Sequence, residues 1–239
     1  MHILVTGASK GIGLSICEAF LKEASEDISL SICSRHQEEI QNARSNLLSL
    51  KKEASIYASE CDVSNATSVS HFIDGATGAN GPIDVLINNA GFGIFKQVVE
   101  MKPQEFRDVL ATNLRGVFLM SQSVVGDMKQ RKHGTIVTIS SLAGKNGFTG
   151  GSAYCAAKFG VRGLMQSLFL EVRSFNIRVI TIFPGSVETD FFHAPGSAGI
   201  HSKKSLKAED VARAVKLAVD LQTNADISEL DIRPTNPKS

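Results

Sequence analysis

Eight residues near the start of the chain constrain its fold most strongly, namely Thr6-Gly-Ala-Ser-Lys-Gly-Ile-Gly13. They follow the apolar run 3–5 and precede the amphipathic stretch 14–21, so the order is strand, glycine turn, helix. A dinucleotide-binding turn needs this order, because its glycines let the backbone approach a pyrophosphate at the positively polarised start of a helix. The spacing differs from G-x-G-x-x-G and is not that of a P-loop. An ordinary strand-to-helix turn is the alternative.

Strand and helix signals alternate along the whole chain, and no linker interrupts them. Candidate parallel strands lie at residues 3–6, 28–33, 55–60, 83–88, 135–140, 177–182 and 227–232, with helices between them. Strands and helices joined in this way predict a single α/β domain over residues 1–239. Its sheet would be doubly wound and parallel, with about seven strands and helices on both faces.

Two of these strands end in polar residues. Asn88-Asn-Ala-Gly91 closes one apolar strand, and Ser140 and Ser141 close another. Open α/β sheets bind their ligands beyond the carboxyl ends of the strands, so both segments are expected there. A hydroxyl at such a position can donate a hydrogen bond to a bound carbonyl oxygen. Neither segment is specific alone, because Asn-rich turns and serine-capped loops are common.

Tyr154 and Lys158 stand four residues apart on a predicted helix and therefore share one face. A free phenol titrates near ~10 and is a poor acid-base catalyst at neutral pH. A neighbouring ammonium favours the phenolate and lowers the phenol pKa, as a proton donor that also acts as a base requires. The alternative is a solvated helix face.

Asn113 occupies a core position in the apolar stripe of another predicted helix, which Pro103 opens. The stripe consists of Phe106, Val109, Leu110, Val117, Met120 and Val124. An unpaired buried amide costs roughly 1–3 kcal/mol, so Asn113 is expected to have partners or a task. A satisfied structural asparagine is the alternative.

Together these motifs resemble the short-chain dehydrogenase/reductase family in its compact, single-domain form, from about Ile3 to Ile232. The resemblance implies a Rossmann-type fold. It maps the family's catalytic residues onto Asn113, Ser141, Tyr154 and Lys158. Ser140 is a rival for the serine role, but the family's gap of thirteen residues to the tyrosine selects Ser141.

The resemblance also implies a cofactor-binding set. Asp62 matches the acidic position that contacts adenine, and the segment 184–189 looks like the one along the nicotinamide. The implied residues are Gly7, Ser9, Lys10, Gly11, Ile12, Gly13, Ser34, Arg35, Asp62, Val63, Asn89, Ala90, Gly91, Tyr154, Lys158, Pro184, Gly185, Val187 and Thr189.

The mechanism that the resemblance implies is reduction of a carbonyl group. The nicotinamide would deliver a hydride, Tyr154 would donate the proton, and Ser141 would hydrogen-bond the oxygen where charge accumulates. Lys158 would lower the Tyr154 pKa and reach the ribose hydroxyls. Asn113 would hold a water that returns a proton to Lys158.

The second strand predicts NADP rather than NAD. An NAD-preferring enzyme usually carries an acidic residue after this strand, and this chain carries Ser34 instead. Arg35 follows, and Lys10 lies in the glycine turn. Two cations and no carboxylate suit the 2′-phosphate of NADP, which a guanidinium can bind bidentately. Simple surface charges are the alternative.

Composition excludes several function classes. The balance of 25 basic and 24 acidic residues gives no nucleic-acid footprint, and no apolar stretch approaches a membrane span. No signal peptide precedes the first strand, so we expect a cytoplasmic protein. The four cysteines show no disulfide or C-x-x-C pattern, and the histidines show no metal-ligand spacing.

The helix that carries Tyr154 is apolar nearly all round, so it must be covered on more than one face. In the family the second cover is a twin subunit, which implies a homodimer or homotetramer. The segment 188–206 reads as a substrate lid. The substrate would be a small carbonyl compound, either a 3-oxoacyl thioester or a pterin or dicarbonyl. A non-catalytic NADP-binding regulator on the same fold is the alternative function.

Overall fold

A computed structural model describes residues 1–22, 28–189, 205–222 and 225–235. Its strands are β1 (His2–Thr6), β2 (Ser29–Ser34), β3 (Ser55–Glu60), β4 (Val85–Asn88), β5 (Gly134–Ile139), β6 (Ile177–Pro184) and β7 (Glu229–Ile232). Its helices are α1 (Gly11–Lys22), α2 (Gln37–Leu50), α3 (Ala66–Asn80), α4 (Pro103–Leu110), α5 (Gly116–Arg131), α6 (Ser152–Val172) and α7 (Ala208–Asp220). Short turns are π-helical at η1 (Ala111–Arg115) and 3-10 at η2 (Leu142–Gly144) and η3 (Arg173–Phe175).

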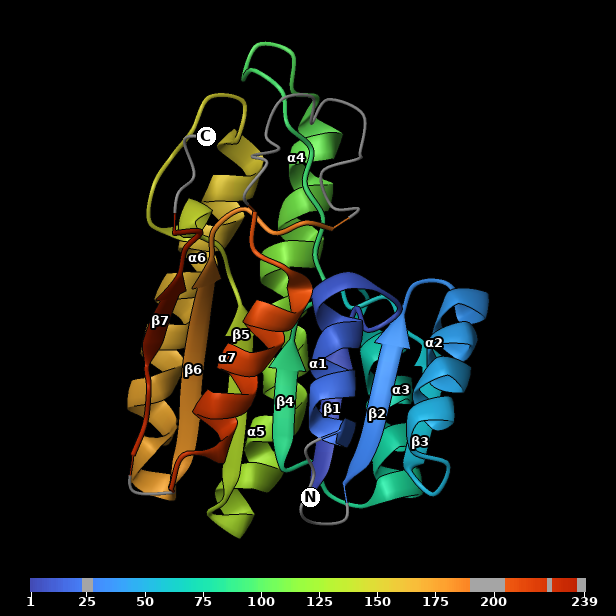
Figure 1. The fold of residues 1–239 in the computed structure, drawn as a ribbon. Coiled ribbons are helices and arrows are strands. Elements are labelled where there is room, and N and C mark those ends of the chain that lie inside the picture. The colour runs from blue at the N-terminus through green and yellow to red at the C-terminus, as the bar shows by residue number, and fades with distance from the viewer. Residues whose placement is uncertain (23–27, 190–204, 223–224, 236–239) are drawn as a thin grey trace.

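The strands form one parallel sheet in the order β3-β2-β1-β4-β5-β6-β7 (Figure 1). The predicted doubly wound sheet is confirmed, and each predicted strand lies within two residues of the observed one. After β3 the chain returns to the other side of β1 and begins β4 there. The carboxyl ends of β1 and β4 therefore form the switch point where an open α/β sheet binds its ligand.

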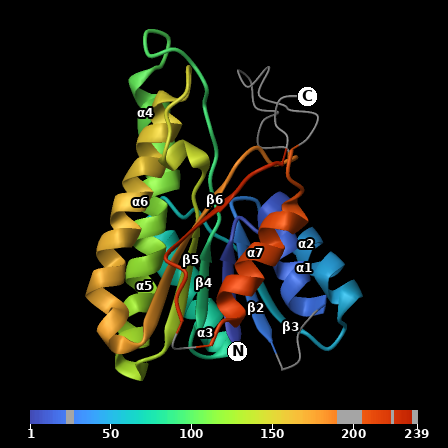
Figure 2. The ribbon, with the colours of Figure 1, turned by 60° about the vertical axis from the view of Figure 1, so that its left-hand side comes forward.

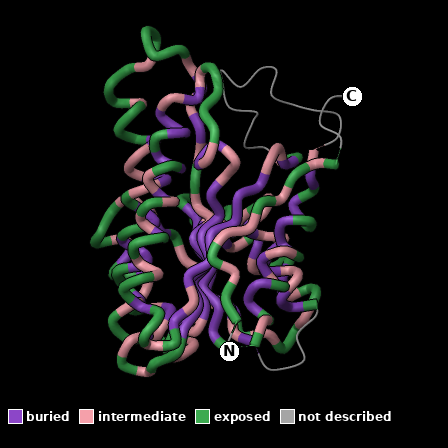
Figure 3. Tube along the Cα trace, turned by 90° about the vertical axis from the view of Figure 1, so that its left-hand side faces the viewer, coloured by how far each residue is buried: buried purple, intermediate pink, exposed green. Residues whose placement is uncertain are grey.

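Helices cover both faces of the sheet, as the sequence predicts (Figure 2). α1, α2 and α7 pack against one face through buried residues such as Phe20, Leu47 and Val215. α3, α5 and α6 pack against the other through Phe72, Val124 and others. The buried strands between the two layers stand out in Figure 3. This double cover explains why the central strands β1, β4 and β6 read as largely continuous apolar runs, whereas β2 and β7 alternate apolar and polar residues.

The helix around Asn113 differs from the prediction in two ways. α4 begins at Pro103 as expected, but the wider π-helical turn η1 separates it from α5. Phe106, placed in the apolar stripe, is 37% exposed, so that assignment is wrong. The extra residue that a π turn inserts rotates the preceding face away from the core. Asn113 itself lies within η1 and is fully buried, as predicted.

Candidate active site

The glycine turn between β1 and α1 lies at the switch point of the sheet. Gly7 and Gly11 have φ angles of +64° and +56°, which glycine adopts without strain. A side chain on Gly13 would come within 2.3 Å of the Gly7 carbonyl oxygen. Gly13 therefore lets α1 start directly against the turn, with its first amides directed at the cleft.

The end of β4 holds this turn in place. The Asn89 side-chain amide donates to the carbonyl oxygens of Thr6 and Gly7, at 3.0 Å each. In return, the Thr6 hydroxyl accepts from the backbone amides of Asn89 and Ala90, also at 3.0 Å. These bonds join the two sides of the switch point, so Asn89 shapes the turn as well as lining the cleft.

Tyr154 and Lys158, in the first turns of α6, come together with Ser141, which lies just beyond the end of β5. The Tyr154 and Ser141 hydroxyls are hydrogen-bonded. Ser141 also accepts from the Ala143 amide at 3.1 Å, which fixes its side chain at the start of η2. The Lys158 amine lies 5.6 Å from the centre of the Tyr154 ring and donates to the Ile139 carbonyl at 2.9 Å.

Ser140, the rival for the serine role, also lines the cleft but makes no such hydrogen bond. Its hydroxyl is buried and has no hydrogen-bond partner among the described residues. A side chain on Gly144 would come within 2.9 Å of it. The geometry thus brings Ser141, rather than Ser140, to Tyr154.

Asn113 reaches the same site from η1. Its side-chain amide nitrogen donates to the carbonyl oxygens of Phe92, at 2.8 Å, and Val109, at 2.9 Å. Its carbonyl oxygen is buried without a partner among the described residues. A side chain on Gly91 would lie 2.6 Å from that oxygen and 3.9 Å from the Lys158 amine. Asn113 and Lys158 therefore flank Gly91, and the Asn113 oxygen can still accept a hydrogen bond.

Burial is the largest influence on the pKa of Tyr154 and on that of Lys158, both of which lie on α6. It raises the pKa of Tyr154 above its ordinary value of 10.0, and the hydrogen bond with Ser141 acts in the opposite direction. It also lowers the pKa of Lys158 from 10.5 to about 8. Desolvation of the phenol is therefore the largest effect on the Tyr154 pKa, and the lowering expected from Lys158 stays a prediction.

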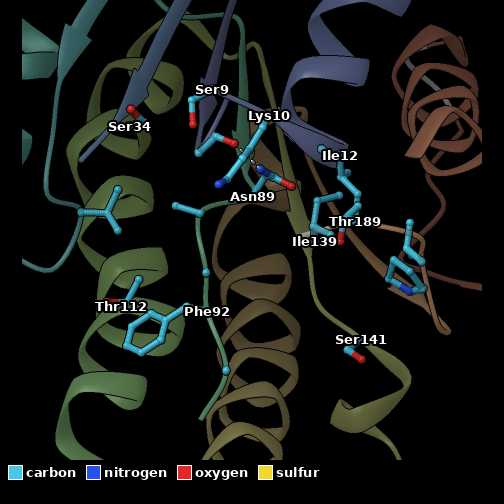
Figure 4. A pocket seen from close by; sticks show the side chains of 18 of the residues that line it. Ser9, Lys10, Ile12, Ser34, Asn89, Phe92, Thr112, Ile139, Ser141 and Thr189 are labelled. Carbon is cyan, nitrogen blue, oxygen red and sulfur yellow. Dashed lines mark hydrogen bonds between the residues drawn. The ribbon is translucent and has the colours of Figure 1, made fainter. Parts of the chain in front are cut away.

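These elements enclose a cleft of about 520 Å³ that runs from the glycine turn to Tyr154. Figure 4 shows Ser9 and Lys10 of the turn at one end and Ser141 at the other. The predicted residues that line it are Gly7, Ser9, Lys10, Gly11, Ile12, Ser34, Arg35, Val63, Asn89, Ala90, Gly91, Ser141, Tyr154, Lys158, Pro184, Gly185, Val187 and Thr189. Most of the predicted site is thus gathered around one cleft.

Three predicted residues do not line the cleft. Gly13 packs behind the turn, and Asn113 lies behind Gly91. The Asp62 carboxylate accepts from the amide and hydroxyl of Ser64, at 2.9 and 2.8 Å, while its neighbours Cys61 and Val63 line the wall. The predicted lid, 188–206, falls mostly outside the described residues.

The cleft also contains residues that sequence reasoning missed. Phe92, with the Arg35 guanidinium 5.5 Å from its ring centre, and Thr112 line it, and both appear in Figure 4. Glu39 of α2 lines the end that holds Lys10 and Arg35, so the expectation of cations without a carboxylate is wrong. The first turn of α2 was a visible signal, because it directly follows the cationic segment.

The described residues also bear on three other features, namely a metal site, a membrane-spanning helix and disulfides. No group of three His, Cys, Asp or Glu side chains in the described part of the chain could hold a metal ion. Across the same residues, no helix is long and apolar enough to cross a membrane. The four cysteines are buried free thiols.

Comparison with known proteins identifies the family. The profile described as short chain dehydrogenase matches residues 1–198. The chain belongs to the short-chain dehydrogenase family. Within this family it is 34% identical to the 3-oxoacyl-acyl-carrier-protein reductase FabG of Escherichia coli strain K12, over 80% of this chain and 75% of that protein.

Two further family members match nearly the whole chain. Sepiapterin reductase of Chlorobaculum tepidum is 29% identical over 98% of this chain and 96% of that protein. A metagenomic short-chain oxidoreductase, solved in complex with NADP, superposes with a TM-score of 0.83 at 30% identity, over 98% of this chain and 97% of the other. The fold and oxidoreductase family of the chain are thus established.

Proposed function

We propose that this short-chain dehydrogenase reduces a ketone or other carbonyl to a secondary alcohol with NADPH, and that Tyr154 is the proton donor. The observation that carries the proposal is the hydrogen bond between the Tyr154 and Ser141 hydroxyls beside the buried Lys158 amine. Two hydroxyls that converge on one point can both hydrogen-bond a carbonyl oxygen placed there. The NADP-bound relative supports the cofactor choice.

The cleft fits a dinucleotide. Gly7 and Gly13 leave no room for side chains, so backbone can approach a pyrophosphate at the start of α1. Ser9, Lys10, Ser34 and Arg35 line the end where an adenosine 2′-phosphate would lie, and a guanidinium can bind phosphate bidentately. A nicotinamide held at the Tyr154 end would supply the hydride.

The protonation of Tyr154 favours reduction. Because burial raises its pKa, the hydroxyl keeps its proton at neutral pH and can donate it to the developing alkoxide. Ser141 stabilises the same oxygen. The protonated Lys158 would stabilise the tyrosinate that remains and then give it a proton. A water on the free Asn113 oxygen would return a proton to Lys158.

The substrate class stays between two candidates. FabG of E. coli acts, by its name, on a 3-oxoacyl-acyl-carrier-protein, and the relative of C. tepidum acts on sepiapterin. We propose a small-molecule carbonyl of one of these kinds, a 3-oxoacyl thioester or a pterin or dicarbonyl. A non-catalytic NADP-binding regulator is the second candidate, and the presence of both Tyr154 and Lys158 argues against it.

The first prediction tests Tyr154. Tyr154→Phe should retain NADPH binding but lose at least ~10²-fold in turnover, because the proton donor is gone while the ring remains. The measurement is NADPH consumption with acetoacetyl-CoA, sepiapterin, diacetyl and simple aldehydes, together with a fluorescence titration of NADPH.

The two serines provide a matched pair. Ser141→Ala should lose more turnover than Ser140→Ala, because only Ser141 contacts Tyr154. For the Tyr154 experiment, near-native turnover by Tyr154→Phe would overturn the role of Tyr154 as proton donor. NADPH binding without turnover of any compound would favour the regulator.

Assembly and location are proposals as well. We propose a cytoplasmic homodimer or homotetramer that does not act on nucleic acid or membranes. Free thiols at all four cysteines suit a reducing compartment. Exposed apolar residues on α5 and α6 favour self-association, and their test is given in the Discussion.

A further inference from the structure

The adenosine end of the cleft carries charges of both signs. Lys10 and Arg35 supply the positive charges, and Glu39 lines the same end. The Ser9 hydroxyl donates to the Glu39 carboxylate at 3.2 Å, which links α2 to the glycine turn. Ser9 is also one of the hydroxyls available to a 2′-phosphate, so Glu39 competes for a donor as well as adding negative charge.

The position of Glu39 is set by α2. The helix begins at Gln37, and both Glu38 and Glu39 lie in its first turn, where negative charge is favoured by the helix N-terminus. Both side chains are exposed, but only Glu39 lines the cleft. Either residue would therefore stabilise the start of α2, but only Glu39 lies at the cleft where the cofactor would bind.

NADPH and NADH differ at the 2′ position of the adenosine ribose, which would lie at this end of the cleft. The 2′-phosphate of NADPH carries about two negative charges near pH 7, which a carboxylate repels. The 2′-hydroxyl of NADH is a donor that a carboxylate accepts well. Glu39 therefore weakens NADPH binding, which Arg35 and Lys10 strengthen. It strengthens NADH binding, which lacks the phosphate contacts.

We propose that Glu39 is a specificity-determining residue that moderates the preference for NADPH, so that the protein also accepts NADH. The inference rests on the proposed function, because it assumes that this cleft binds a nicotinamide dinucleotide. It assigns opposite effects to two nearby residues, because Arg35 would favour binding of the 2′-phosphate and Glu39 would oppose it. Removing the Glu39 charge should therefore increase the preference for NADPH over NADH.

The test measures binding of two fragments, adenosine 2′,5′-bisphosphate and 5′-AMP, by calorimetry. This readout does not depend on turnover. Glu39→Gln should raise the affinity ratio of the bisphosphate over AMP by about 5–10-fold, a typical effect for one charge near a partly exposed site. Glu39→Lys should raise it further, and Arg35→Asp should lower it.

Glu38→Gln is the matched control, because it removes the same charge from the same helical turn outside the cleft. Its affinity ratio should equal that of the wild type. The ratio of kcat/KM for NADPH and NADH should follow the fragment ratio in each variant.

Two results separate the possible failures. If the wild type binds the bisphosphate and Glu39→Gln changes the ratio no more than Glu38→Gln does, the role of Glu39 is overturned and the proposed function stands. If the wild type binds neither fragment nor NADPH, the proposed function fails and this inference fails with it.

Discussion

Lys158 is a charged group in the interior, only 5% exposed, and its amine donates to the Ile139 carbonyl beside the Tyr154 ring. Burial lowers its pKa to about 8 because the charged amine loses hydration. A group whose pKa is lower in the folded state than in the unfolded chain destabilises the fold wherever it is protonated in both states. We infer that Lys158 is kept for its role beside Tyr154, although its buried charge makes the fold less stable.

Lys158→Met tests this at the residue scale. Below pH 8 the wild type carries the whole cost of the buried charge, which is ~3 kcal/mol of folding free energy for a Lys158 pKa that falls from 10.5 to about 8. The variant avoids this cost but loses the hydrogen bond to Ile139, which is worth ~1 kcal/mol. Between pH 8 and 10.5 the unfolded chain binds more protons, so wild-type stability rises with pH relative to the variant. Urea unfolding should show Lys158→Met more stable by about 1–2 kcal/mol at pH 7, with the gap closing toward pH 10. The exposed Lys52→Met is the control, and a less stable Lys158→Met at pH 7 would contradict the account.

At the scale of elements, a charged cluster joins η2, α6 and β7 behind the site. Glu229 of β7 accepts from Arg162 Nε at 2.7 Å and Nη2 at 3.0 Å, and it pairs with Lys145 at 3.0 Å. Burial opposes ionisation of Glu229, but hydrogen bonds from Arg162 and Lys145 hold its pKa below the ordinary value. Arg162 lies one turn after Lys158, and Lys145 directly follows η2, so the cluster fixes Tyr154 and Ser141 relative to each other.

Glu229→Gln should therefore weaken both the fold and the site. At pH 7 we expect a loss of about 1–3 kcal/mol, because two cations lose their shared partner. Since the Glu229 pKa is lowered in the fold, this contribution exists above pH 4.5 and declines as pH falls below it. Urea unfolding at pH 7 and pH 4 measures the difference, with the exposed Glu171→Gln on α6 as control. Equal stability losses for the two variants would remove the special role of the cluster.

The same elements show what sequence reasoning could reach. The central strands were predictable because parallel strands covered on both faces are continuous apolar runs. The edge strand β3 is only partly buried, yet it was placed at its observed bounds. The π turn at Asn113 was not, because no residue type in this segment marks where a helix widens by one residue. Glu39 was missed although it lies in the first turn of the helix after the cationic segment, because its approach to the cleft depends on the angle at which α2 leaves β2.

At the scale of the whole molecule, the apolar surface is uneven. Four large apolar side chains on α4, α5 and α6 are exposed, by 37% to 62%, and these helices stand together on one side of the molecule (Figure 2). They are Phe106, Phe118, Phe159 and Leu170. α7, on the opposite face of the sheet, exposes Leu217 by 60%. Exposed apolar residues on helices that stand together favour an interface with a second copy rather than solvent.

The last prediction tests that interface. Phe159→Lys should convert a dimer or tetramer into a smaller species, because it places a charge in a surface that the partner must desolvate. Leu217→Lys, a similar change on the opposite face, should leave the assembly intact. Light scattering coupled to size-exclusion chromatography gives the mass of each variant. Because α6 carries both Phe159 and the Tyr154–Lys158 pair, loss of the partner should also lower turnover, whereas Leu217→Lys should not. A monomeric wild type would contradict the interface, and so would a Phe159→Lys variant that keeps the wild-type mass.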